Sequence, residues 1–232
     1  MSPNDSNSSW YLTDQLDIDR WMIIERFKAI KPLLTGDTCL EMGPAEGIMT
    51  NLLIKEFIEL DVLDASQTLL DQIDPRDNLR KFCRCFENFE ADRLYDTIIM
   101  DHVLEHIKNP ILVLKKVKGW LKPTGVLIAG VPNADSIHRL AAVKMGLLAN
   151  KYSLNERDKK LGHYRVYDFK LLNEHLTKAG FNITTNGGVF LKTLSYAQLQ
   201  EQWDQNIIKA FIELGKDFPT IAAEIFVVAS KL

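Results

Sequence analysis

The segment 39–47, Cys-Leu-Glu-Met-Gly-Pro-Ala-Glu-Gly, has the residue types of a ligand-binding loop. A short apolar stretch runs into Gly43 and Gly47, which let the backbone turn sharply and let a ligand approach where a Cβ would intrude. The spacing is Gly-x-x-x-Gly, and the Gly-x-Gly-x-x-Gly that brings a backbone against a pyrophosphate is absent. Glu41 suits a cationic ligand better than an anionic one. We therefore predict a strand, a tight turn and a helix around a ligand without phosphate, where a branched side chain at Gly47 would block the ligand. A plain strand-to-helix turn is the alternative.

A second acidic residue follows at the distance that a nucleoside ligand requires. Residues 58–66 read Ile-Glu-Leu-Asp-Val-Leu-Asp-Ala-Ser, and the strand-like run ends on Asp64. This acid comes about 20 residues after the glycine loop, where a carboxylate can accept hydrogen bonds from ribose hydroxyls. Asp64 could instead stabilise the N-terminus of the next helix. Two acids at neighbouring strand ends favour the ligand site.

Three chemically active side chains, His102, Glu105 and His106, come directly after a buried apolar segment. Their i, i+3, i+4 spacing places them on one face of a helical turn. The string His-x-x-Glu-His also matches a hydrolase pattern in which two histidines bind zinc. Because it follows a strand and no third metal ligand is evident, we expect no metal here and activity without added metal. The alternatives are a divalent ion that lowers the pKa of a bound hydroxyl, and side chains that only orient the turn.

The elements that must position these residues alternate between strand and helix, which is typical of a parallel sheet with helices on both faces. Predicted strands cover Thr38–Met42, Ile58–Leu63, Lys81–Phe86, Tyr95–Met100, Gly125–Val131, Phe181–Asn186 and Glu224–Ala229. Predicted helices cover Asp19–Leu34 (ending near Pro32), Ile48–Lys55, Gln67–Ile73, Pro110–Leu121, Asp168–Ala179 and Ser195–Leu214. We divide the chain into a flexible N-terminal segment, 1–18, and one domain, 19–232.

The chain between Asn133 and Asp168 breaks the alternation with a long polar stretch that reads as helix over 135–161. Connections of this length in compact domains are usually lids or binding elements. We therefore interpret 134–167 as a lid, and 193–220 as a second, helical insert. The lid carries side chains suited to anion binding or proton transfer: His138, Arg139, Tyr152, Arg157, His163, Tyr164, Arg165 and Tyr167. Two of the arginines could hold a phosphate or carboxylate; solvated or capping arginines are the alternative.

Four segments, in order, resemble those of class I methyltransferases that use S-adenosylmethionine (SAM), and the likeness runs from about Trp21 to Leu232. They are Glu41-x-Gly43-x-x-x-Gly47, Leu63-Asp64-Ala-Ser66, the stretch 95–106 (Tyr-Asp-Thr-Ile-Ile-Met-Asp-His-Val-Leu-Glu-His) and the stretch 121–128 (Leu-Lys-Pro-Thr-Gly-Val-Leu-Ile). The resemblance implies an α/β, Rossmann-like fold: a seven-stranded mixed sheet with helices on both faces and a helical lid insertion. Six strands would be parallel and one antiparallel, Glu224–Ala229, beside the fifth. Glu41 and Pro44 depart from the commonest first motif, which keeps both glycines.

The resemblance also implies the cofactor and its contacts. The cofactor would be SAM, with S-adenosylhomocysteine (SAH) as the product. Gly43 and Gly47 would face its methionine part, Asp64 the ribose, and the loop Phe86–Glu87 the adenine. The cofactor-binding residues that we expect are Glu41, Gly43, Pro44, Gly47, Asp64, Ala65, Ser66, Phe86, Glu87, Asp101 and His102.

Methyl transfer asks the chain to align an acceptor and, for an oxygen acceptor, to remove a proton. A histidine, whose pKa is about 6.5, suits that task. The expected catalytic residues are, in falling order, His163, His102 and His106, whereas His138 and His175 look like helix-surface residues. The acceptor we expect is a hydroxyl, less so an amine, of a natural-product, quinone or sugar intermediate, because the chain is similar to small-molecule O-methyltransferases. A SAM- or nucleotide-binding module without catalysis and an NAD-type oxidoreductase are the rival functions.

Composition bears on partners and compartment. The chain has 232 residues, 46% of them hydrophobic and 25% charged, with a formal net charge of −3. These values are typical of a soluble globular protein and argue against a nucleic-acid partner. No apolar run approaches the roughly 20 residues that cross a bilayer, and Cys39, Cys83 and Cys85 suggest neither disulfides nor a zinc site. We expect a small-molecule partner, no nucleic acid, no membrane and a cytoplasmic location, with a homodimer as the assembly to consider.

Overall fold

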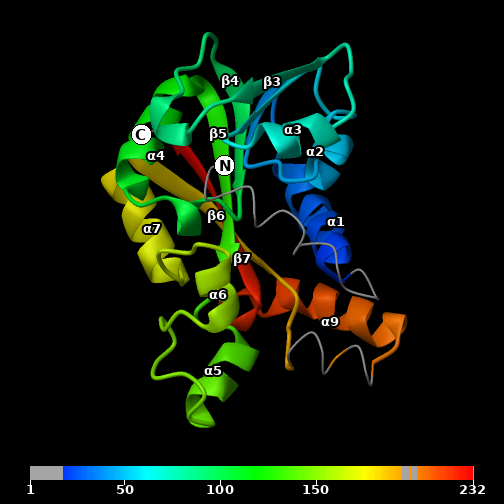
Figure 1. The fold of residues 1–232 in the computed structure, drawn as a ribbon, viewed down its shortest axis with the longest axis vertical. Coiled ribbons are helices and arrows are strands. Elements are labelled where there is room, and N and C mark those ends of the chain that lie inside the picture. The colour runs from blue at the N-terminus through cyan, green and yellow to red at the C-terminus, as the bar shows by residue number, and fades with distance from the viewer. Residues whose placement is uncertain (1–17, 195–198, 200–202, 232) are drawn as a thin grey trace.

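The chain folds around one seven-stranded sheet, seen in a computed structural model that describes residues 18–194, 199 and 203–231 (Figure 1). The strands are β1 (Thr38–Met42), β2 (Glu59–Asp64), β3 (Leu79–Cys83), β4 (Tyr95–Asp101), β5 (Leu121–Pro132), β6 (Phe181–Val189) and β7 (Glu224–Lys231). Their order is β3-β2-β1-β4-β5-β7-β6, and β7 runs antiparallel to both of its neighbours. The expected topology of six parallel strands and one antiparallel strand beside the fifth is therefore confirmed.

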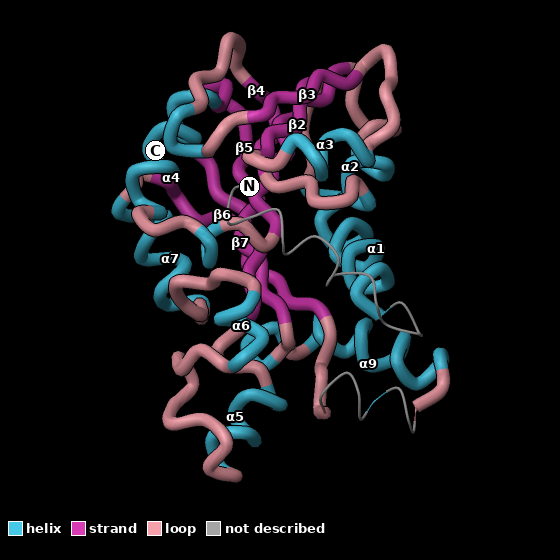
Figure 2. The backbone as a smooth tube through the Cα atoms, viewed as in Figure 1, coloured by secondary structure: helices cyan, strands magenta, loops and turns pink. Residues whose placement is uncertain are grey.

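Helices cover both faces of the sheet (Figures 1 and 2). The α-helices are α1 (Ile18–Ile30), α2 (Ile48–Leu53), α3 (Gln67–Gln72), α4 (Pro110–Trp120), α5 (Ile137–Lys144), α6 (Glu156–Lys160), α7 (Phe169–Lys178) and α9 (Gln205–Asp217). Short 3-10 turns are η2 (Lys31–Leu33), η3 (Phe86–Asn88), η4 (Leu104–His106) and η5 (Pro219–Ile221). Apolar side chains of α4 and α7 fill the core on one face, and those of α1, α2, α3 and α9 fill the core on the other. No helix of the described residues is long and apolar enough to span a bilayer.

The helix α7 shows how the sequence sets its own boundaries. Asp168 accepts a hydrogen bond from the backbone N–H of Leu171 at 2.8 Å, which satisfies one of the unpaired donors of the first turn. Leu172 and Leu176, one turn apart, are buried against the sheet. Gly180 then takes a left-handed conformation (φ 89°), which ends the helix and starts β6. The predicted helix Asp168–Ala179 is confirmed.

Several predicted boundaries differ from the structure. The third strand is Leu79–Cys83, because it pairs with β2 from Leu60 to Asp64 and both strands end together, so Phe86 lies in η3. The predicted helix over 135–161 is two short helices, α5 and α6, joined by a loop that passes through Gly146 (φ 73°). The predicted helix Ser195–Leu214 overlaps α9, which begins at Gln205 after the cap Asp204 and extends to Asp217. Residues 1–17, 195–198 and 200–202 lie outside the described residues, so the predictions made for them are not addressed.

Candidate functional site

One pocket brings together the glycine loop after β1, the end of β4 and the lid. It has a volume of about 240 Å³, and its walls come from segments around Glu41 to Met49, Asp101 to His106 and Asn155 to Val166. The carboxyl ends of β1 and β4 meet here because these strands are parallel neighbours. Ligands of open α/β sheets bind at this edge. The pocket is therefore the candidate site that the sequence predicts.

The glycine loop needs its glycines for backbone geometry and for packing within the protein. Gly43 and Gly47 have φ of 71° and 80°, a region that strains other residues. A Cβ at Gly43 would lie 2.7 Å from Val103 Cγ2, and a Cβ at Gly47 would lie 2.7 Å from Ile73 Cγ1. A Cβ at Gly47 therefore meets Ile73 first, and blocking of a ligand by a side chain at this position stays a prediction. Substitution at Gly47 tests packing, and another residue must test ligand binding.

The two predicted acids lie at the ends of neighbouring strands but differ in setting. Glu41 is almost wholly buried and lines the pocket; its Oε2 accepts a hydrogen bond from Thr50 Oγ1 at 2.6 Å. Burial raises the pKa of Glu41 to about 8. Asp64 accepts a hydrogen bond from the backbone N–H of Ser66 at 2.8 Å, and burial raises its pKa as well. The acids are joined through the backbone, since the N–H of Gly43 donates to the carbonyl of Leu63 at 2.9 Å.

The predicted cofactor residues divide into two groups by position. Those that line the pocket are Glu41, Gly43, Pro44, Asp101 and His102. Those that lie beside it, at the ends of β2 and β3, in η3 or at the start of α2, are Gly47, Asp64, Ala65, Ser66, Phe86 and Glu87. Phe86 reaches toward the loop, and its Cζ is 3.9 Å from where a Cβ of Gly43 would be. The residues predicted to contact adenine and ribose are therefore not among those that line this pocket.

A buried arginine that the sequence reasoning missed holds the base of the pocket together. Arg26 of α1 donates from Nε to Asp101 Oδ2 at 2.8 Å and from Nη1 to Glu224 Oε2. Burial alone would raise the pKa of Glu224, but the positive charge of Arg26 lowers it to about 2. The sequence contained one indication that Arg26 is buried. Arg26 lies one turn from Met22 and from Ile30, and both of these apolar residues are on the buried face of α1.

His102 lies directly beyond β4, between two carboxylates. Its φ is 56°, and its backbone N–H donates to the carbonyl of Gly130 at 2.9 Å, which fixes the turn. Its Nδ1 is 3.5 Å from Glu105 Oε1, and its Nε2 is 3.5 Å from Glu224 Oε1. Burial would lower the pKa of His102, as would Arg26, but the attraction of Glu224 and Asp101 raises it overall. The ring is therefore placed in the pocket with acids on both sides.

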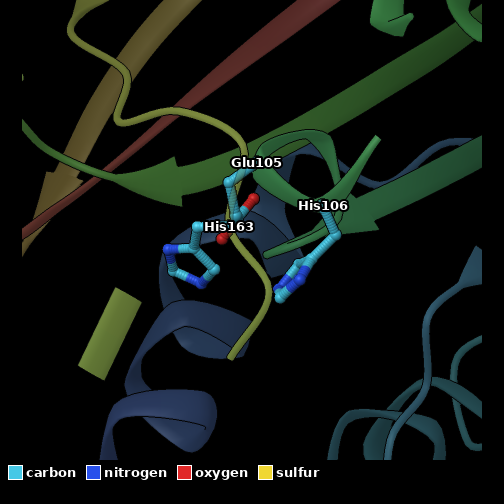
Figure 3. Close-up of side chains that lie close together, drawn as sticks. All are labelled: Glu105, His106 and His163. Atoms are coloured by element: carbon cyan, nitrogen blue, oxygen red, sulfur yellow. The ribbon is translucent and has the colours of Figure 1, made fainter. Parts of the chain in front are cut away.

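The other two predicted histidines meet across the pocket. Glu105 and His106 project from η4, and His163 reaches them from the loop after α6 (Figure 3). The rings of His106 and His163 are perpendicular, with centroids 4.6 Å apart. Burial has the largest effect on the pKa of His106, and the nearby His163 and His102 act in the same direction. Together they lower this pKa to about 3. His163 lies 57 positions after His106 in the sequence, so it is the fold that brings these three side chains together.

Residues 20–186 match a family of methyltransferase domains. The chain belongs to this methyltransferase family. The matched range contains the glycine loop, the acid of β2, the His102 turn and the lid, so it includes most of the pocket described above. A search of curated protein sequences gives no match.

Solved structures share the fold of this methyltransferase at low sequence identity. The complex between the Haloferax volcanii Trm112 methyltransferase activator and its methyltransferase-type partner contains a chain that is 16% identical (TM-score 0.68), with 99% of this chain and 97% of that chain covered. A SAM-dependent methyltransferase from Archaeoglobus fulgidus is 17% identical (TM-score 0.62), with 91% and 94% covered. The N-methyltransferase NodS from Bradyrhizobium japonicum WM9, solved with SAH, is 14% identical (TM-score 0.59), with 97% and 92% covered. Identities in this range establish a common fold.

The lid of the methyltransferase is anchored, and two of its arginines serve that purpose. Arg139 is buried and donates from Nε to the carbonyl of Lys151 at 2.6 Å and from Nη1 to Asp158 at 3.3 Å. Arg165 donates to the carbonyls of Leu104, Ile107 and Lys108, the last at 2.9 Å. These hydrogen bonds favour the alternative in which the two arginines serve the fold. Arg139 and Arg157 both line the pocket as well.

Arg165→Ala is expected to destabilise the methyltransferase by about 1.5–3 kcal/mol, because carbonyl groups at the end of η4 lose charge-assisted hydrogen bonds. The free energy of unfolding in urea measures this effect. Lys159→Ala is the matched control, because Lys159 is exposed and pairs with Glu156 one turn away, a surface pair worth about 0–1 kcal/mol. Equal losses in both variants would contradict the anchoring role.

The two histidines predicted to be on helix surfaces differ in their surroundings. His138 of α5 lines the pocket, and burial, helped by the charge of Lys192, lowers its pKa to about 3. His175 of α7 is half-buried, and its Nδ1 is 3.0 Å from the hydroxyl of Tyr167. The prediction for His138 is wrong, because α5 packs against the pocket. His138 is thus a pocket residue that sequence reasoning missed.

Proposed function

We propose that this methyltransferase transfers a methyl group from SAM to a hydroxyl, less readily an amine, of a small natural-product, quinone or sugar-type acceptor. The observation that carries the proposal is a single pocket that joins the glycine loop, the carboxyl groups of Glu41 and Asp101, and His102. The lid, 134–167, covers the acceptor in this proposal, and the segment 193–220 is a separate helical insert. Small-molecule acceptors fit a narrow pocket of about 240 Å³ beneath a lid.

The chemistry of the pocket fits SAM. SAM supplies a methyl group that its positive sulfonium already activates, together with a cationic ammonium group. Glu41 and Asp101 place acidic groups in the pocket wall, and Asp64 places a carboxylate at the end of the next strand. A carboxylate at a strand end suits ribose hydroxyls, and an acidic wall suits a cation. The residues present therefore agree with the cofactor that the resemblance implies.

For an oxygen acceptor, His102 is the group we propose to accept the proton. The sequence places His163 first, but the structure offers a physical reason to prefer His102. An imidazole flanked by Glu105 and Glu224, each at 3.5 Å, is stabilised when it gains a proton. His106 has a pKa of about 3, which makes it a weak base, and His163 is directed toward Glu105 and His106 (Figure 3).

Two rival functions make different predictions. An NAD-type oxidoreductase is disfavoured by the Gly-x-x-x-Gly spacing and by the methyltransferase family. A SAM-binding module without catalysis would bind SAH but release no methyl group. Calorimetric titration with SAM, SAH and NAD separates the first rival, and transfer of labelled methyl from SAM to a panel of hydroxyl and amine acceptors separates the second.

Asp64→Ala is expected to weaken SAH binding by about 1–3 kcal/mol, which is roughly 5-fold to 150-fold, because the proposed ribose contact is a charge-assisted hydrogen bond. Calorimetry measures the change. Asp71→Ala, at the exposed end of α3, is the control, and its SAH affinity is expected to match that of the unaltered protein. An unchanged affinity in Asp64→Ala would contradict the proposed cofactor site.

A further inference from the structure

We propose that Glu105, His106 and His163 form a binding site for one divalent transition-metal ion in the wall of the pocket. Each residue offers one ligand atom, and the three atoms lie within 4.8 Å of one another. Two ligands come from η4 and the third from the lid, so the side chains approach one another from two segments (Figure 3). The sequence shows no third metal ligand beside the His102–Glu105–His106 string, and in the structure the lid brings His163 to two of these residues.

The buried carboxyl group of Glu105 is the second observation that points to a cation. Glu105 is 0% exposed, and neither of its oxygens accepts a hydrogen bond from the residues that the structure describes. His102 Nδ1 lies 3.5 Å from Oε1 but forms no hydrogen bond with it. A buried carboxyl group without a hydrogen bond is costly, and native structures normally supply a partner. A cation between Glu105 and the two imidazoles supplies that partner.

The polypeptide holds the three ligands in place before any ion binds. The backbone N–H of Tyr164, next to His163, donates to the carbonyl of Glu105 at 2.8 Å. Arg165 donates to the carbonyls of Leu104 and Lys108, on either side of the two η4 ligands. Oδ1 of Asp158 lies 3.5 Å from Nδ1 of His163. A carboxylate at one ring nitrogen is the usual device that orients a metal-binding histidine and leaves its other nitrogen for the ion.

The ligand types select the class of ion. Two imidazoles and one carboxylate suit zinc and neighbouring transition metals, whereas magnesium and calcium prefer oxygen ligands only. Three protein ligands also leave a coordination position open. His106 and His163 line the pocket, so that position faces the space where a substrate binds. In the methyl transfer proposed above, an ion here would orient an acceptor oxygen and lower its pKa; this role rests on the proposed function, whereas ion binding does not.

Calorimetric titration of the chelator-stripped full chain with Zn²⁺ tests the site. The expected result is one Zn²⁺ per chain. His106→Ala, His163→Ala and Glu105→Gln should each weaken binding by about 100-fold or more, since losing even an outer partner of a ligand costs roughly 10–100-fold. His175→Ala is the matched control, because it removes a half-buried histidine outside the cluster, and it should bind Zn²⁺ like the unaltered chain.

Circular dichroism and SAH binding on the same variants show that they are folded. Absence of Zn²⁺ binding, or equal binding in the cluster variants and the control, would overturn the proposal and leave a protonated Glu105 as the explanation of its unpaired oxygens. Cluster-dependent Zn²⁺ binding without methyl transfer would support the metal site and contradict the proposed function. Methyl transfer without cluster-dependent Zn²⁺ binding would support the proposed function and contradict the metal site.

Discussion

His102→Asn is expected to lower the turnover number by about 10²–10⁴-fold, the usual contribution of a general base. Asparagine cannot take up the proton at neutral pH, yet it tolerates the left-handed backbone at this position, where φ is 56°. The affinity for SAH should change much less than turnover, because the proposed role is toward the acceptor. Steady-state methyl transfer and SAH calorimetry on the same preparation measure the two quantities.

The control for this substitution is His175→Asn. It removes a half-buried histidine of α7 that contacts Tyr167. Its turnover should equal that of the unaltered enzyme. If turnover in His102→Asn falls only in proportion to SAH affinity, His102 supports the cofactor pocket and the base is another group. Unchanged turnover would mean that the acceptor needs no base.

Arg26→Ala is expected to reduce the free energy of unfolding by about 3–5 kcal/mol, because it leaves Asp101 and Glu224 as buried charges without their shared partner. Arg26 is 8% exposed and bonds both acids, which lie 75 and 198 positions further along the chain. Unfolding in urea measures the loss. Glu224→Gln added to Arg26→Ala should recover part of it by removing one of the stranded charges.

Lys28→Ala tests whether the loss of unfolding free energy comes from the buried ion pairs of Arg26 or from any substitution in α1. The Lys28 side chain is 58% exposed and pairs with Glu25 on the same helix, so a loss of about 0–1 kcal/mol is expected.

The pH dependence of the stability provides a second check. Because Arg26 holds the pKa of Glu224 near 2, below its ordinary 4.5, this stabilisation is present above pH 4.5 and is lost as the pH falls toward 2. Arg26→Ala should flatten that acid-dependent loss; similar stability in both single variants would contradict the role of the pair.

Local patterns in the sequence were enough to predict the sheet, the helices that cover it and the glycine loop. Strand β1 was predicted at its observed bounds, and α7 is bounded by Asp168 and Gly180, as its capping residues indicate. These features depend on residues a few positions apart, where periodicity, caps and turn residues act directly. The antiparallel β7 was expected only from the resemblance, because no local pattern gives a strand its direction.

Only the tertiary structure could decide which distant side chains share the pocket. Arg26 and Glu224 pair across almost the whole chain, and His163 reaches Glu105 and His106 because the lid folds back onto η4. The sequence also did not show that Ile73, directly after α3, lies next to Gly47. The sequence determines the local elements and the residue types at their ends. The packing of those elements determines which groups meet, because burial and long-range charge pairs exist only once the chain has folded.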